Sequence, residues 1–239
     1  MSGSEIKTAV LGVKGEGGEI LEAAMGVKAL NVVAIADKDR KLVEKQALKY
    51  GCEGFDDYRQ LIIQNQLDCL IAAAPVHSCE EYIRMAFKKN FNVIKTSPAA
   101  RNYEEANEFV QLAENQGVNF TVINPARSLE SFVRLRSAVQ SGLIDHPFMI
   151  KIECEVRSAD QHPWQKDPRL AGGGVLLYEC HDLVDQLVAN FGVPQQVYSL
   201  NTGIAGDRQQ RLSMTEDISS VMMKFSDSLI GLISATRTH

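Results

Sequence analysis

The sequence predicts an α/β fold: a doubly wound parallel sheet over residues 1–123, followed by an α+β domain over residues 124–239 with a mostly antiparallel sheet. In the first half, continuous apolar runs alternate with segments of helical periodicity, which is typical of a parallel sheet covered on both faces. In the second half, apolar and polar residues alternate along strand-length runs, which is typical of hairpin-paired strands with one exposed face.

Each predicted element of the first half depends on a local pattern. The strand at 8–12 is an apolar run that ends in glycine, and the next strand, at 31–37, ends at an acidic residue. The helix between them, at 19–30, has its apolar residues at three- and four-residue intervals. The alternation continues with helices at 38–50 and 58–64, a strand at 68–74, a helix from residue 80, a strand at 91–96, a helix at 103–115 and a strand at 119–123.

The second half contains a helix at 131–141 and a long apolar helix at 174–191, with strands predicted at 148–157, 196–202, 218–225 and 229–236. The last strand runs almost to the end of the sequence. If it is an edge of the sheet, its unpaired backbone groups favour pairing with another chain. The alternative is that a loop covers it, or that it pairs inside its own domain.

Composition narrows the class of protein. Among 239 residues, 30 are acidic and 25 are basic, so the net charge of −5 argues against a nucleic-acid or anionic-membrane partner. The apolar runs are strand-sized and the first residues lack an apolar signal core, so we expect neither a membrane helix nor secretion, but a cytoplasmic protein. Five cysteines without a C-x-x-C pair indicate neither a disulfide framework nor a metal site.

A glycine-rich turn follows the first strand and carries the first functional signal. Gly12, Gly15 and Gly17 lie where a strand passes into a helix, an arrangement that presents helix N–H groups to a pyrophosphate. Lys14 occupies the middle glycine position of the G-x-G-x-x-G pattern, which weakens phosphate binding by steric hindrance or adds a positive charge to it. The alternative is an ordinary glycine turn of an α/β protein.

Asp37 ends the second strand, where an acid accepts hydrogen bonds from the ribose of a dinucleotide. A carboxylate repels the 2′-phosphate of NADP, so Asp37 favours NAD over NADP. Lys38 and Arg40 follow it and could neutralise that phosphate, although they also fit surface charges at the start of a helix.

The chain resembles the glucose–fructose oxidoreductase/inositol dehydrogenase (Gfo/Idh/MocA) family. The resemblance is carried, in order, by TAVLGVKGEG, VVAIADKD, FDDYRQLI, LIAAAPVHS, NVIKTSPAA, WQKDPRLAGGGVLL, HDLVD and SSVMMKFSDSLIGLISA. It implies a Rossmann domain joined to an α+β domain whose open sheet commonly forms a homo-oligomer interface. It also implies NAD(P)-dependent oxidation or reduction of sugars, inositols or related polyols. Relatives generally continue beyond this point, so the chain resembles a fragment, or a short form that a partner completes.

The family's Glu-Lys-Pro triplet falls on Thr96, Ser97 and Pro98, so the lysine that assists proton transfer in relatives is replaced by Ser97. Ser97 and Pro98 would border the cofactor. Lys95 lies on the same strand face as Ser97, about 6–7 Å away. It is therefore a candidate to replace the missing amine, or simply a basic residue near a strand end.

The family's second catalytic segment is also altered. Where relatives place an acid and then a histidine, this chain has Tyr178 and Asp182, and His181 comes one position early, as it does in some relatives. Histidine suits acid–base catalysis because its ordinary pKa lies near neutrality. Asp185 follows one turn later and could orient His181 or bind a substrate hydroxyl. Alternatively, the two are an i,i+4 pair without chemistry.

Ala74, Pro75 and His77 match a family turn that borders the cofactor, although a histidine there can also simply cap the next helix. The leading hypothesis is an NAD(P)-dependent oxidoreductase acting on a sugar, inositol or related small alcohol, with His181, Asp185 and Lys95 as catalytic candidates. The alternative is a catalytically inactive family member that acts as a binding or scaffolding subunit. A third possibility is elimination or glycoside cleavage without net oxidation.

Overall fold

The computed structural model describes residues 5–157, 162–204, 207–209 and 214–238. The chain divides into two compact units, Met1–Ile123 and Asn124–His239. Within the described residues, no helix is both long enough and apolar enough to cross a membrane.

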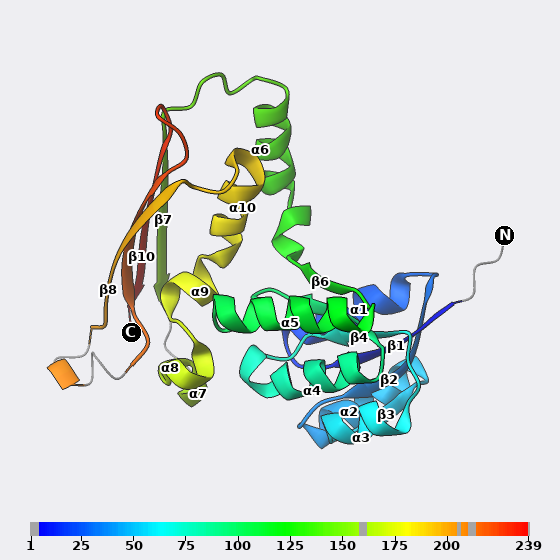
Figure 1. The fold of residues 1–239 in the computed structure, drawn as a ribbon. Helices are drawn as coiled ribbons and strands as arrows, with labels where there is room; N and C mark the ends of the chain where they lie inside the picture. The colour runs from blue at the N-terminus through cyan, green and yellow to red at the C-terminus, as the bar shows by residue number, and fades with distance from the viewer. Residues whose placement is uncertain (1–4, 158–161, 205–206, 210–213, 239) are drawn as a thin grey trace. The chain divides into compact units, whose positions relative to one another are not determined.

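The first unit is a six-stranded, all-parallel sheet in the order β3-β2-β1-β4-β5-β6, with helices on both faces, so the predicted doubly wound fold is confirmed (Figure 1). Its elements are β1 Ile6–Leu11, α1 Glu16–Gly26, β2 Leu30–Ala36, α2 Arg40–Tyr50, β3 Glu53–Phe55, α3 Tyr58–Gln64, β4 Cys69–Ala72, α4 Val76–Lys88, β5 Asn92–Thr96, α5 Tyr103–Gln116 and β6 Phe120–Ile123.

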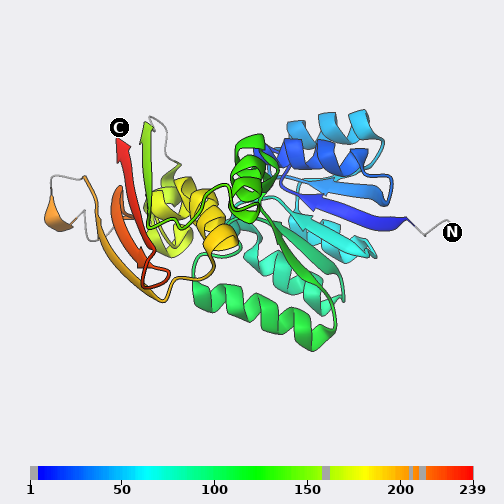
Figure 2. The same cartoon turned by 90° about the horizontal axis from the view of Figure 1, so that it is seen from above.

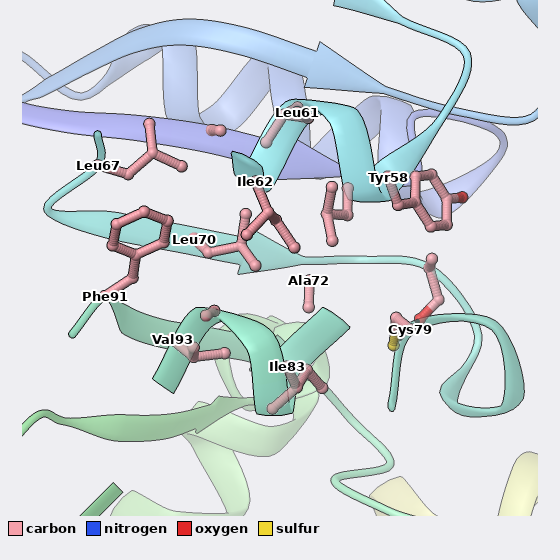
Figure 3. Close-up of a cluster of buried hydrophobic side chains, with 14 of the residues drawn as sticks. Tyr58, Leu61, Ile62, Leu67, Leu70, Ala72, Cys79, Ile83, Phe91 and Val93 are labelled. Carbon is pink, nitrogen blue, oxygen red and sulfur yellow. Dashed lines mark hydrogen bonds between the residues drawn. The ribbon is translucent and has the colours of Figure 1, made fainter. Parts of the chain in front are cut away.

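Two hydrophobic cores cover the two faces of this sheet. The larger contains Leu61 and Ile62 of α3 and Ile83 of α4, packed on Leu70 and Val93 of the strands (Figure 3). The smaller joins residues of α1 and α2 to the opposite face. The apolar runs of the sequence therefore form strands that are buried on both faces, because alternate side chains enter different cores.

Two helix starts differ from the prediction by three or four residues. Helix α1 begins at Glu16 rather than residue 19, although Gly17 and Gly18 disfavour helix, because the helix packs closely on the preceding turn. Helix α4 begins at Val76 rather than residue 80, with Pro75 before it. The short strand β3 was not predicted, since three residues leave too little pattern to recognise.

The second unit is built on a four-stranded mixed sheet in the order β7-β10-β9-β8. Its elements are the 3-10 helix η1 Pro125–Ser128, α6 Glu130–Gln140, β7 Met149–Arg157, α7 Pro163–Lys166, α8 Pro168–Ala171, α9 Val175–Glu179, α10 His181–Phe191, β8 Gln196–Thr202, β9 Ile218–Lys224 and β10 Ile230–Thr238. The short helices η1, α7 and α8 were not predicted.

The last strand is not an edge. Strand β10 pairs in parallel with β7 and antiparallel with β9, so its backbone groups are satisfied on both sides and the edges are β7 and β8. An edge position for this strand, considered from the sequence, is therefore wrong, because β7, which is distant in sequence, pairs with its second side.

The single helix predicted at 174–191 is also wrong, because the structure has two helices there. It divides at Cys180 (φ −114°, ψ −4°), which ends α9 and immediately precedes α10. Both helices lie over one face of the sheet (Figure 2). Leu187, with Val184 and Phe191 beside it, packs there on Val221 and Ile233, which forms the core of this unit.

Candidate functional site

The turn between β1 and α1 requires glycine at two positions. Gly12 has φ +80°, and a Cβ there would lie 2.6 Å from the backbone nitrogen of Ala74 at the end of β4. A Cβ on Gly17 would lie 2.3 Å from the carbonyl oxygen of Gly12. These are the first and third glycines of the dinucleotide pattern, and they let β4 and α1 approach the turn closely.

Lys14, at the middle glycine position, is exposed and does not have a positive φ. Its backbone conformation therefore does not require glycine, and its side chain extends to solvent rather than filling the turn. Gly15 precedes α1 with φ +59° and has open space where a Cβ would be. No side chain caps the N-terminus of α1, so this end suits an anionic group, although Glu16 and Glu19 in the first turn oppose one.

Asp37 is 7% exposed and lies directly beside this turn. One carboxylate oxygen accepts the N–H of Val13 at 2.9 Å, and the other accepts the N–H of Asp39 at 3.0 Å. A carboxylate has about four acceptor sites, so two remain for ribose hydroxyls. Lys38, the next residue, is exposed. The turn and the acid therefore fit a dinucleotide, with Lys14 as the main departure from the family pattern.

The residues that follow β4 lie at the same carboxyl end of the sheet as the glycine turn. The N–H of Ala74 donates to the carbonyl of Leu11 at 3.0 Å, which fixes it beside Gly12. Pro75 is exposed, and His77 follows in the first turn of α4. Burial lowers the pKa of His77, and the positive charges of Lys38 and Arg101 lower it further.

Lys95 is 1% exposed near the end of β5. Its Nζ donates to the carbonyl oxygen of Thr96 at 2.6 Å and lies 3.3 Å from its Oγ1. Within the described residues, no carboxylate comes within ion-pair distance of this amine. Burial therefore lowers its pKa, which Cys79 and Glu16 only partly oppose.

Ser97 and Pro98 follow Lys95 at the same end of β5, and both are partly exposed. The N–H of Ser97 donates to the carbonyl oxygen of Ile123 at 2.9 Å, and the Ser97–Pro98 peptide bond is cis. Ser97 therefore lies at the carboxyl end of the parallel strands, as Gly12 and Ala74 do.

In the second unit, His181 is the first residue of α10. Its Nε2 lies 2.8 Å from Oδ1 of Asp182, but in a geometry that is not a hydrogen bond, so this buried nitrogen has no hydrogen-bond partner within the described residues. Asp185 is engaged elsewhere: Arg127 donates to both its oxygens at 2.5 and 2.6 Å, and Asn124 donates to one at 3.0 Å. Arg127 is the main cause of the lowered pKa of Asp185.

Two residues that sequence reasoning missed hold the segment that carries His181. Glu216 accepts the N–H groups of Gly174 and Leu176, and a Cβ on Gly174 would lie 2.0 Å from its carbonyl oxygen. Arg237 of β10 is 1% exposed and donates to Glu179 at 3.2 Å. In the sequence, only the Gly-Gly-Gly run at 172–174 indicates such close packing, and no local pattern identifies Glu216 or Arg237 as partners of this segment.

Two family models cover most of the chain. The model described as an oxidoreductase family with an NAD-binding Rossmann fold (GFO_IDH_MocA) matches residues 6–124. The model described as the GFO/IDH/MocA C-terminal domain matches residues 132–239.

Individual relatives are distant. The chain is 23% identical over 168 residues to an uncharacterised oxidoreductase of Schizosaccharomyces pombe, a match that covers 70% of this chain and 45% of that protein. It is 25% identical over 149 residues to the D-apiose dehydrogenase of Rhizobium rhizogenes, covering 62% of this chain and 43% of that protein. The matched regions thus span less than half of either relative.

Solved structures share the fold. The WlbA dehydrogenase of Bordetella pertussis, in complex with NADH and UDP-GlcNAcA, matches with a TM-score of 0.85 at 18% identity, over 97% of this chain and 72% of that one. The myo-inositol 2-dehydrogenase of Lactobacillus plantarum matches with a TM-score of 0.82 at 18% identity, over 98% of this chain and 70% of that one.

Proposed function

The chain belongs to the Gfo/Idh/MocA oxidoreductase family, and on that premise we propose that it binds a nicotinamide dinucleotide and takes part in oxidising or reducing a sugar, inositol or related small alcohol. The observation that carries the proposal is the turn in which Gly12 and Gly17 leave no room for side chains, with Asp37 hydrogen-bonded to its backbone. The matched regions of the curated dehydrogenase and oxidoreductase relatives support the same class of reaction.

Residues of the first unit would hold the cofactor. Gly12, Gly15 and Gly17 shape the turn that receives the pyrophosphate, and Lys14 supplies a positive charge beside it. Asp37 receives the ribose hydroxyls, and Ala74, Pro75, His77, Ser97 and Pro98 border the rest of the dinucleotide. When bound, the nicotinamide supplies hydride transfer.

We propose NAD rather than NADP as the preferred cofactor. The Asp37 carboxylate repels a 2′-phosphate, and Arg40 already donates to Glu44 at 2.9 Å on the surface of α2. Lys38 remains exposed and is the residue best placed to oppose this preference. Binding of NADPH as tight as that of NADH would contradict the assignment.

His181 is our candidate for moving the hydroxyl proton of the substrate. Histidine suits acid–base catalysis near neutral pH, and the Nε2 of His181 forms no hydrogen bond within the described residues. Lys95 is a second candidate because burial lowers its pKa toward the range in which an amine accepts protons. Asp185 fits a positioning role better, since Arg127 and Asn124 occupy its oxygens.

We further propose that the chain associates with a second copy through the outer face of its C-terminal sheet. Tyr198 and Met222 pair across β8 and β9 on this face, and Leu232 of β10 continues the row. Tyr198, Leu200 and Met222 are 66%, 81% and 50% exposed, and this apolar row lines a shallow groove. Such a contiguous apolar face is typical of an interaction surface. The cytoplasmic location expected from the sequence stays a prediction.

The alternative is a binding or scaffolding subunit without turnover. Ser97 in place of the family lysine favours it, because a hydroxyl alone cannot act as a base near neutrality. Elimination or glycoside cleavage remains a further possibility for the same cofactor site.

The test is a screen of sugars and inositols with NAD, following NADH absorbance, on the wild type and on two histidine variants. We expect His181→Ala to lower kcat at least 100-fold. His146→Ala is the matched control, because that side chain is 95% exposed, and it should leave kcat unchanged. Cofactor binding without turnover would favour the non-catalytic subunit, and absence of binding at millimolar cofactor would overturn the proposal.

A further inference from the structure

Two thiols from distant parts of the second unit meet beneath the segment that carries His181. Cys154 lies on β7, facing the helices, and is paired in register with Ala235 of β10. Cys180 lies between α9 and α10 and is fully buried. Ala235, itself 0% exposed, packs with Cys180 and Val175, and Cys154 packs against the same cluster. The small side chain of Ala235 therefore leaves the space in which the two cysteines approach.

The Cys154 thiol lies against the backbone directly before Cys180, within the same packed cluster. The Cys154 thiol points at the carbonyl oxygen of Glu179, at 3.8 Å, and Glu179 immediately precedes Cys180. Burial is the main cause that raises the pKa of Cys180 to about 12, and the Cys154 thiol contributes to the same rise.

The three cysteines of the first unit are different. Cys52, Cys69 and Cys79 are each held as thiols by burial, which raises the pKa of all three. None of these shifts involves another cysteine, and Cys79 donates instead to the carbonyl oxygen of Ala74. Among the cysteines, only Cys154 and Cys180 share a hydrophobic cluster within the described residues.

We propose that Cys154 and Cys180 form a reversible disulfide, and thus a modification site that fixes β7 to the junction between α9 and α10. The oxidant is a low-molecular-weight disulfide such as oxidised glutathione. The deprotonated sulfur of Cys154, the more exposed cysteine, attacks one sulfur of the oxidant, forms a mixed disulfide and releases one thiol.

The sulfur of Cys180, after losing its proton, then attacks Sγ of Cys154. The new S–S bond forms and the second glutathione leaves as its thiol. The two cysteines together lose two electrons and two protons, and the oxidant gains both. Because Cys180 is buried and rarely deprotonated, we expect the second step to be the slower one.

The position of Cys180 gives this bond a consequence. Cys180 precedes His181 directly, and its backbone forms the break between α9 and α10. A bond to β7 would tie that break to the sheet and restrict the start of α10. Glu179 on the other side is already held by Arg237, so the disulfide would add a second anchor to the same junction.

The experiment uses the full chain, reduced and then incubated with excess oxidised glutathione at mildly alkaline pH. Remaining thiols are alkylated, and the protein is digested without reductant. We expect a linked pair of peptides that contain Cys154 and Cys180, and its loss after dithiothreitol. This readout requires neither cofactor nor substrate, so it is independent of the proposed function.

Cys154→Ser and Cys180→Ser should each abolish the linked pair, and Cys180→Ala serves as a second variant because serine would bury a hydroxyl. Cys52→Ser, in the first unit, is the matched control and should leave the pair intact. In Cys180→Ala, the mixed disulfide should accumulate on Cys154. If the wild type also stops at the mixed disulfide, or if the pair forms only in urea, the proposal is overturned.

Discussion

The backbone N–H of Val13 donates to the carboxylate of Asp37 at 2.9 Å, which fastens the glycine turn after β1 to the end of β2. The acid that suggests a ribose partner in the sequence is thus also a structural part of the turn. The two roles are compatible because each carboxylate oxygen accepts more than one hydrogen bond.

Asp37→Asn tests both roles, because it removes the negative charge and one of the two acceptor oxygens. An amide can accept from only one of the two N–H groups, so a buried donor is left unpaired at a cost of about 1–3 kcal/mol. We expect this loss in urea unfolding and a fall of at least tenfold in NADH affinity by calorimetry. Asp39→Asn, which keeps its cap on α2, is the control and should bind NADH normally. Unchanged affinity in Asp37→Asn would remove Asp37 from the proposed site.

The glycines of the turn should differ in their tolerance of a methyl group. Gly12→Ala and Gly17→Ala place a Cβ against backbone atoms, so each should lose more than about 2 kcal/mol of unfolding free energy and bind no cofactor. Gly15→Ala has open space, and its positive φ should cost only about 1–2 kcal/mol. Gly51→Ala has the same kind of backbone away from the turn, so it isolates the conformational cost. Equal unfolding midpoints for Gly12→Ala and Gly15→Ala would contradict the close packing.

Asp185 should contribute to the stability of the fold rather than to the chemical step. Its side chain is 27% exposed and Arg127 is 55% exposed, so Asp185→Asn should cost only about 1 kcal/mol in thermal or urea unfolding. Turnover, once a substrate is found, should fall far less than in His181→Ala. Abolished turnover at unchanged stability would return Asp185 to the catalytic set.

The buried amine of Lys95 should make the free energy of unfolding depend on pH. Burial lowers its pKa in the folded state below that of the unfolded chain, so between those two values the unfolded state binds more protons. Stability should therefore rise with pH in that window, up to about pH 10, and the buried charge should be most costly at lower pH. Lys95→Met removes the group, and its advantage over the wild type should shrink between pH 7 and pH 9.5. Parallel unfolding curves across this range would show that Lys95 is not desolvated.

Much of the fold follows from local pattern. Five of the six strands of the first unit are predicted almost to their ends, because runs such as Cys69–Ala72 are apolar on both faces. Helix α3 begins where expected because Asp57 caps it. The place of β10 in the sheet could not be predicted, since its second neighbour, β7, is set by packing between segments distant in sequence. The break at Cys180 likewise carries no glycine or proline to signal it.

The candidate site could likewise be predicted only in part. The positions of Gly12, Gly17 and Asp37 follow from spacing along one β-α-β unit, and the structure brings all three together at one turn. The engagement of Asp185 by Arg127 could not be foreseen, because an i,i+4 spacing from His181 says nothing of residues elsewhere in the chain. Glu216 was missed for the same reason.

Calorimetric titration of the chain with NADH, and separately with NADPH, tests the central claim most directly. The turn and Asp37 predict micromolar binding of NADH, at least tenfold weaker binding of NADPH, and loss of binding in Gly12→Val. Lys14→Glu, an exposed change that spares the fold, should also weaken binding. Absence of heat with either nucleotide at millimolar concentration, in a chain that remains folded, would contradict the account.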